Sequence, residues 1–150
     1  MQNFIRLTIF LTIATTFSVA IPRPASAAEV LITEEEAKLP PAKDAKPDSR
    51  GITRGPRISL LPESPMRSPF HLQLKFQFSG GAQIDPQSLR VTLLKTPEVD
   101  LTPRVKPFAQ VDGLDMPEAA APAGEYVVRV ELKDTEGRAT AKIFSLKVAQ

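Results

Sequence analysis

The sequence contains no cysteine, no tryptophan, one tyrosine and one histidine. Without cysteine the chain forms no disulfide and offers neither a thiolate nucleophile nor a thiolate metal site. A single imidazole, that of His71, does not supply the several histidine ligands of a copper centre. The lack of tryptophan also removes the aromatic platforms on which sugars stack. These absences argue against most metal-binding, redox and sugar-binding functions.

Motifs for nucleophilic catalysis and phosphate binding are missing as well. The sequence has neither a Gly-x-Ser-x-Gly nor a Ser-x-x-Lys motif. A catalytic triad would depend on His71, which we expect to be one of several solvent-facing residues on the polar side of a strand. No helix is expected after Gly80-Gly81, so these glycines do not form a phosphate cradle. We therefore predict that the protein is not an enzyme and has no catalytic, cofactor-binding or metal-binding residues.

The N-terminus has the pattern of an export signal. Arg6 is followed by fifteen residues without a charge and then by an Ala-x-Ala site that ends at Ala27. The uncharged run is shorter than the ~20 residues of a membrane-spanning helix, which favours a cleaved signal peptide over residues 1–27 and a protein that is periplasmic or secreted. Cleavage removes Arg6 and Arg23, so the 19 basic residues fall to 17 and equal the 17 acidic ones. The pI of about 9.0 therefore belongs to the precursor and predicts no nucleic-acid or membrane partner.

The next segment, residues 28–56, is rich in proline and charge and has no aromatic residue. Thr33 is able to cap one helical turn over residues 34–38, but Pro40, Pro41 and Pro47 prevent the helix from continuing. Such a composition buries too little apolar surface to offset the entropy of ordering, so we predict a flexible linker. The alternative is a docking peptide centred on residues 30–32.

Alternation of apolar and polar residues predicts β-strands in the remaining chain. It is clearest over residues 70–78, which places one side of that strand in a core and the other in water, as in an antiparallel sheet. We expect further strands over residues 57–61, 88–95, 99–102, 105–108, 113–116, 126–132 and 139–148. No helix is expected, and residues 119–122 are predicted to be a loop.

The last two strands are predicted to form a hairpin. Asp134 and Gly137 flank a tight turn, because aspartate bonds its own backbone and glycine adopts positive φ. In the returning strand the apolar residues change phase near Ile143 and Phe144, which predicts a β-bulge or a change of sheet partner there.

About seven short strands separated by proline and glycine turns are typical of a two-sheet sandwich over residues 57–149. We expect the core to use the following aromatic residues: Phe70, Phe76, Phe78, Tyr126 and Phe144. The segments Gly55–Ser59, Ser68-Pro69 and Pro122–Gly137 resemble those of bacterial Ig-like domains of exported proteins. That resemblance implies an all-β, antiparallel Ig-like sandwich, with the Tyr126 hydroxyl bonded to nearby backbone, and it implies no activity.

The Pro-x-Gly-x-Tyr sequence at residues 122–126 and the final hairpin are also similar to those of periplasmic copper-carrier proteins. That family binds copper through an N-terminal histidine, further histidines and methionine-rich loops. In this chain the predicted mature N-terminus is Ala28, His71 is the only histidine, and Met66 and Met116 are isolated. The residues that hold copper in the family are therefore not present.

Two pairs of carboxylates remain as candidates for a weak Ca²⁺ site, namely Asp112 with Asp115 and Asp134 with Glu136, although neither has an EF-hand spacing. The polar residues of strands 70–78 and 126–132 form a candidate contact surface: His71, Gln73, Lys75, Gln77, Arg129, Glu131 and Lys133. We predict an exported, non-enzymatic module that contacts an envelope or extracellular protein or supports the envelope structurally. The alternative is a periplasmic carrier of a metal or small ligand.

Overall fold

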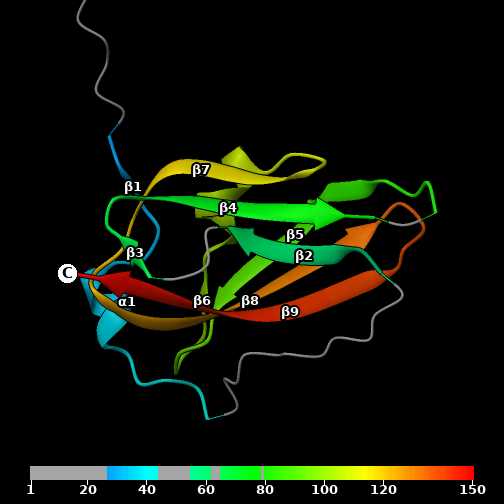
Figure 1. Ribbon diagram of the computed structural model, residues 1–150. Coiled ribbons are helices and arrows are strands. Elements are labelled where there is room, and N and C mark those ends of the chain that lie inside the picture. Colours follow the sequence, from blue (N-terminus) through cyan, green and yellow to red (C-terminus); the bar gives the residue numbers. More distant parts are fainter. Residues whose placement is uncertain (1–26, 44–54, 62–64, 79) are drawn as a thin grey trace, which may run out of the picture.

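The computed structural model describes residues 27–43, 55–61, 65–78 and 80–150. Within them, two β-sheets pack face to face (Figure 1). One sheet has four strands in the order β1-β7-β4-β2, and the other has five in the order β3-β9-β8-β5-β6. The predicted all-β sandwich is confirmed, although the described residues contain nine strands where about seven were expected.

The strands lie close to the predicted positions, and three short helices accompany them. The strands are β1 (Glu29–Val30), β2 (Arg57–Leu61), β3 (Met66–Arg67), β4 (Phe70–Gln77), β5 (Ile84–Leu93), β6 (Val99–Asp100), β7 (Gly113–Ala120), β8 (Gly124–Asp134) and β9 (Ala139–Ala149). The helices are α1 (Glu34–Lys38), α2 (Thr102–Val105) and the 3₁₀ helix η1 (Lys106–Phe108). The expectation that the domain has no helix is therefore wrong.

Strand β4 shows why alternation predicted this fold well. Its residues alternate without a break between buried and exposed or half-buried positions, and Phe76 is 3% exposed. Phe78, however, is 46% exposed, so the prediction that it belongs to the core is wrong. The strand ends at Gln77, one residue earlier than the pattern indicates, and Phe78 therefore lies beyond the last paired position of the sheet.

Two of the strand pairs are parallel, contrary to the expectation of a purely antiparallel sheet. Strand β1 pairs with β7, and β3 pairs with β9, in both cases over two residues. All other neighbouring strands are antiparallel. Both exceptions are short strands that add to a sheet edge, where pairing in either direction satisfies the exposed backbone groups.

The β8–β9 hairpin is confirmed, but the predicted bulge in β9 is not present. Asp134 accepts a hydrogen bond from the Gly137 backbone, and Gly137 has a φ of 79°. The two strands pair without a shift from Gly124–Val148 to Lys133–Ala139. Polar side chains fill the inward positions instead: Thr140 is buried, and Lys142 Nζ donates to the Ile58 carbonyl at 3.0 Å. The apolar phase changes because lysine and threonine face inward, and the backbone remains regular.

The middle of the chain departs most from the prediction. Strand β5 begins at Ile84, four residues before the strand predicted over residues 88–95, and its pairing with β8 shifts register between Asp85 and Arg90. Of the short strands predicted over residues 99–102 and 105–108, only Val99–Asp100 is a strand, and residues 102–108 are helical. Pro103 suits a first helical turn, and the turn buries Leu101 and Val105 completely. The predicted loop at residues 119–122 begins as the end of β7, where Ala119 is fully buried.

The segment before the sandwich is also different from the prediction. Residues 28–43 do not form a flexible linker: Leu31 and Ile32 are 1% and 2% exposed, and α1 has a complete capping box between Thr33 and Glu36. Two adjacent aliphatic side chains provide enough buried surface to order the segment once β7 offers a free edge. We call residues 29–42 the N-terminal segment. The rest of the predicted linker, residues 44–54, lies outside the described residues, as does the predicted signal peptide apart from Ala27.

In the part of the chain that the structure describes, no helix is long and apolar enough to cross a membrane.

Candidate functional site

A shallow pocket of about 160 Å³ lies on the outer face of the four-stranded sheet. Strands β2, β4 and β7 and the loop before β7 form it, and its lining is mostly polar. The side chains and backbone groups that line it belong to Leu61, Gln73, Leu74, Lys75, Gln110, Asp112, Gly113, Leu114 and Asp115. The pocket therefore joins part of the predicted polar face of β4 to one of the predicted carboxylate pairs.

The close approach of β7 to β4 depends on a glycine. A Cβ atom at Gly113 would overlap the carbonyl oxygen of Leu74 on the neighbouring strand. The next residue back, Asp112, accepts a hydrogen bond from the Phe76 backbone at 2.9 Å. Any larger residue at position 113 would separate these strands, so the floor of the pocket requires glycine here.

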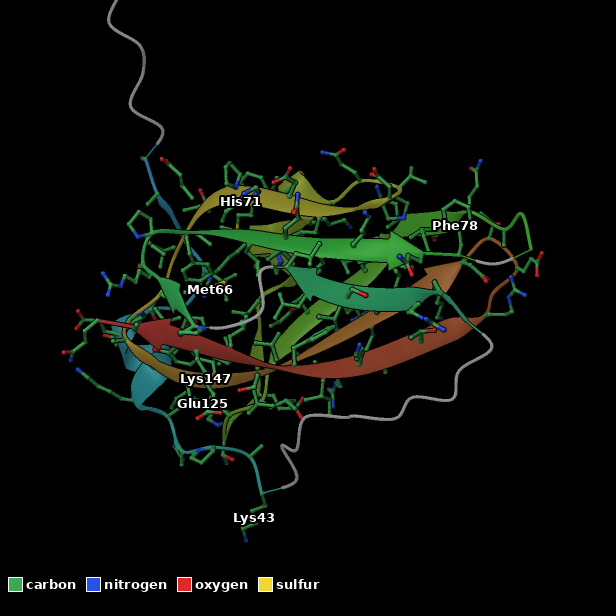
Figure 2. The ribbon with its side chains drawn as sticks, in the orientation of Figure 1. Lys43, Met66, His71, Phe78, Glu125 and Lys147 are labelled. Carbon is green, nitrogen blue, oxygen red and sulfur yellow. The ribbon has the colours of Figure 1, made fainter. Side chains whose placement is uncertain are left out.

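His71 and Asp115 form an ion-pair contact beside this pocket, across β4 and β7. Both side chains are about half exposed, at 50% and 47%. The pairing of β4 with β7 shifts register between Phe70 and Leu72, which brings Asp115 towards His71, and Figure 2 shows His71 on the outer side of this sheet. The prediction that His71 faces solvent is correct, but the sequence did not indicate its partner, because the two residues are 44 positions apart.

The contacts of His71 do not resemble those of a catalytic base. No serine or threonine hydroxyl of the described residues hydrogen-bonds to its ring, and both members of the pair are open to water. In the same residues there is no group of three or more His, Cys, Asp or Glu side chains that could hold a metal ion. His71 and Asp115 together would supply two ligands of these types to a metal.

The two predicted carboxylate pairs have different surroundings. Asp112 and Asp115 line the same pocket as Lys75, so one positive and two negative charges meet there. Asp134 accepts hydrogen bonds from the Glu136 and Arg138 backbones at 3.0 and 2.9 Å, and from Arg138 Nε at 2.7 Å. Burial raises the pKa of Asp134, but the hydrogen bonds and charge of Arg138 outweigh it and hold the pKa below its usual 3.8. Glu136 contacts the same guanidinium at 3.0 Å, so a Ca²⁺ ion would compete with Arg138 for both carboxylates.

The predicted contact surface is not continuous. The polar residues of β4 lie on the outer face of the four-stranded sheet, whereas Arg129, Glu131 and Lys133 lie on β8 in the five-stranded sheet. The two sheets are separate layers (Figure 1). Their inner faces form the core, so the burial patterns of β4 and β8 place these two groups on opposite outer faces. The alternation within each strand was correct, but it does not indicate which strands share a sheet.

A second polar cluster fixes the N-terminal segment and was not predicted. Arg104 of α2 donates from Nη1 and Nη2 to the two carboxylate oxygens of Glu36, both at 2.7 Å, and from Nη1 to the Leu31 carbonyl at 2.8 Å. Lys95 is 9% exposed, and its Nζ donates to the carbonyls of Ala37 and Leu39 at 3.0 and 2.9 Å. Its charge therefore lies at the C-terminal end of α1, where backbone carbonyls accept hydrogen bonds.

The pKa of Glu36 is lowered from 4.5 to about 2, mainly by the hydrogen bond from Arg104 and also by the capping contacts with Thr33, which together outweigh the effect of burial. Glu36 therefore stabilises the docked segment fully above pH 4.5, and this contribution is lost as the pH falls towards 2. At pH 7 we expect Glu36→Gln to cost about 1–3 kcal/mol of unfolding free energy. The difference in melting temperature between the variant and the wild type should shrink steadily between pH 5 and pH 2.

Glu35→Gln is the matched control, because Glu35 lies on the same helical turn and is exposed. Its melting temperature should follow that of the wild type at every pH. A Glu36→Gln difference that is the same at pH 5 and at pH 2 would show that the ion pair with Arg104 does not stabilise the fold.

No protein-family model and no curated protein matches the chain. Among solved structures, it is similar to the crystal structure of CopC from Methylosinus trichosporium OB3b. The two are 14% identical, and the match covers 62% of this chain and 94% of that chain with a TM-score of 0.41. A likeness at this level supports no inference about the function of this chain.

Proposed function

We propose that this chain is an exported, non-enzymatic Ig-like module that acts through contact with another protein of the cell envelope, or as a structural accessory there. The strand order supports the Ig-like assignment. In an Ig sandwich the first, second and fifth strands are neighbours, with the fourth beside the fifth, and the third, sixth and seventh form the other sheet. Here β2, β4 and β7 take the places of the first, second and fifth strands, and β1 takes the place of the fourth strand beside β7. In the other sheet, the three central strands β5, β8 and β9 take the places of the third, sixth and seventh strands.

The hydroxyl of Tyr126 supports the same assignment. It donates to the Pro122 carbonyl at 2.8 Å, near the start of β8. This contact resembles the tyrosine corner of Ig-like sandwiches, in which a tyrosine near the start of the sixth strand bonds to backbone a few residues upstream. The contact was expected from the sequence and is confirmed.

The observation that most supports a contact function is the distribution of exposed apolar side chains. Among the described residues, four large hydrophobic side chains are 40–49% exposed: Val30, Leu61, Phe78 and Val111. All four lie on the strands of the four-stranded sheet or in the segments directly next to them, and Leu61 also lines the pocket. The four side chains do not form one continuous patch, since Val30 and Leu61 lie on opposite edge strands of this sheet, but their restriction to one sheet favours that sheet as the contact surface.

A photoreactive amino acid at position 61 tests this proposal. When the mature chain is irradiated in its own cell envelope, we expect position 61 to crosslink to one defined protein. Position 133 is the matched control, because Lys133 is exposed on the five-stranded sheet. Crosslinks of equal yield from both positions, or none from position 61, would count against a contact surface on the four-stranded sheet.

The His71–Asp115 contact favours a second candidate function, that of a metal carrier, since imidazole and carboxylate are both metal ligands. This candidate requires Cu²⁺ or Zn²⁺ to raise the melting temperature and requires His71→Ala to abolish the rise. A melting temperature that neither metal changes removes it.

A further inference from the structure

An open cleft of about 350 Å³ lies between helix α1 and the start of strand β8. Sites for small molecules usually measure about 300–1,000 Å³, so this cleft has room for a small ligand. One wall is a face of α1, formed by Glu34, Ala37 and Lys38, which are three and four positions apart and therefore lie on the same side of the helix. The other wall is formed by residues 122–126.

Contacts among the described residues hold both walls in place. Lys95 Nζ donates to the carbonyls of Ala37 and Leu39 at 3.0 and 2.9 Å and lies 5.7 Å from the centre of the Tyr126 ring, so one buried side chain contacts both walls. The Tyr126 hydroxyl donates to the Pro122 carbonyl at 2.8 Å, which fixes the second wall. The cleft is therefore formed before a ligand arrives, and a preformed site loses less conformational freedom on binding.

The interior of the cleft is mainly apolar, and a glycine keeps part of it open. Tyr126 is the most buried residue of the lining, and Ala37 and Pro122 are half-buried beside it. A Cβ atom at Gly124 would lie 3.2 Å from the Tyr126 hydroxyl oxygen and 3.3 Å from the ring carbon that carries it. Glycine at position 124 therefore leaves this end of the tyrosine uncovered, so that the apolar body of a ligand can pack against it.

Charges of both signs surround the cleft. Glu34 and Lys38 are exposed, and neither side chain forms an ion pair or a hydrogen bond among the described residues. Glu125 accepts a hydrogen bond from Ser145 Oγ at 2.9 Å and lies 3.7 Å from Lys147 Nζ (Figure 2), an exposed pair of the kind that contributes little. Behind the cleft, Lys95 is buried and has no carboxylate partner in the part of the chain that the structure describes. Two carboxylates and two ammonium groups therefore act on a ligand there.

We propose that this cleft binds a short zwitterionic peptide of about the size of a dipeptide. Its ammonium group contacts Glu34 and Glu125, and its carboxylate contacts Lys38. A ligand with a single charge meets as many like charges as opposite ones, whereas a zwitterion pairs with both kinds. Charge-assisted hydrogen bonds at the two ends then fix the orientation of the ligand.

The spacing of the charges favours a dipeptide over a single amino acid. Glu34 and Lys38 lie four residues apart on α1, a rise of about 6 Å. Two extended peptide residues span up to about 7 Å. In a free amino acid the ammonium and carboxylate groups are attached to the same carbon atom, so they do not reach both partners equally well.

The dipeptide Ala-Leu tests this proposal in an NMR titration of the mature chain. We expect a Kd of about 1 mM or tighter, with shifts of the backbone amide signals of Ala37, Lys38, Gly124 and Glu125. N-acetyl-Ala-Leu and Ala-Leu-amide each lack one charge, and each should bind about tenfold more weakly. Free leucine should also bind more weakly than Ala-Leu.

Two variants distinguish the ends of the ligand. Lys38→Gln should weaken the binding of Ala-Leu about tenfold and leave that of Ala-Leu-amide unchanged, because the amide has no charge for Lys38 to contact. Glu34→Gln should weaken the binding of Ala-Leu by a smaller factor, since Glu125 remains, and leave that of N-acetyl-Ala-Leu unchanged. Glu35→Gln and Lys43→Gln are the matched controls, because both residues are exposed and neither lines the cleft.

The proposal is wrong if Ala-Leu shifts none of these signals at about 10 mM, ten times the expected Kd. It is also wrong if free leucine or either capped form binds as tightly as Ala-Leu, or if Lys38→Gln binds Ala-Leu as well as Lys43→Gln does. No residue lines both this cleft and the pocket on the four-stranded sheet. The titration and the crosslinking at position 61 can therefore fail independently of each other.

Discussion

Phe76→Asp is expected to unfold the whole domain at room temperature. Phe76 lies near the end of β4, 3% exposed, between the two sheets. Truncation of a buried phenylalanine alone costs about 3–5 kcal/mol, and the new carboxylate adds the cost of burying a charge without a partner. Domains of this kind have about 5–15 kcal/mol of stability in total. Circular dichroism should therefore show loss of the β-sheet signal and no cooperative melting transition.

Lys75→Asp is the matched control, because it places the same residue one position away on the opposite side of the strand. Lys75 is exposed and lines the shallow pocket. Surface substitutions of this kind usually change the unfolding free energy by less than about 0.5 kcal/mol. A Phe76→Asp variant that melts within a few degrees of Lys75→Asp would mean that β4 does not bury this side.

Leu31→Asp is expected to release the N-terminal segment while the sandwich stays folded. Leu31 is 1% exposed, and burial of a leucine contributes about 2–3 kcal/mol. A carboxylate in its place would be buried among aliphatic side chains, so the segment should leave the sheet edge and expose the carboxylate to water. The destabilisation is then limited to the free energy of docking. We expect the melting temperature to fall by roughly 10 °C and limited proteolysis to cleave within residues 29–42.

Val30→Asp is the control for this prediction. Val30 is the neighbouring residue of β1, and its side chain is 49% exposed. The melting temperature and the protease resistance of residues 29–42 should stay close to those of the wild type. If Leu31→Asp behaves like Val30→Asp, the segment does not depend on burial of Leu31 for its docking.

The alternation in β4 and β8 made the sandwich predictable, because each strand buries one side in the shared core, and a period of two shows this directly in the sequence. The same rule failed in β9 for an identifiable reason. Lys142 faces inward because its amine reaches the Ile58 carbonyl and lies 5.0 Å from the centre of the Phe144 ring, so a polar residue occupies a core-side position without a bulge. A pattern of polarity does not detect a long side chain that passes through apolar surroundings to a polar partner.

The prediction of a flexible linker was wrong for the N-terminal segment for a different reason. Its local composition predicts disorder when the segment is considered alone, since two aliphatic residues and one helical turn do not form a core. The docking peptide over residues 30–32 was considered as an alternative, and the structure places its Leu31 and Ile32 in the core of the same chain. The contacts of Arg104 and Lys95 join residues 56 to 73 positions apart, and such pairs leave no periodic signal.

The sequence by itself determined the all-β class, the β8–β9 turn, the Tyr126 hydroxyl contact and the absence of thiol chemistry. Each of these depends on residue type, on a period of two or on contacts between residues close in sequence. Only the tertiary structure decided that His71 meets Asp115, that the polar faces of β4 and β8 point in opposite directions, and that residues 29–42 complete the four-stranded sheet. These features depend on which strands become neighbours, and that choice is made by the packing of the whole core.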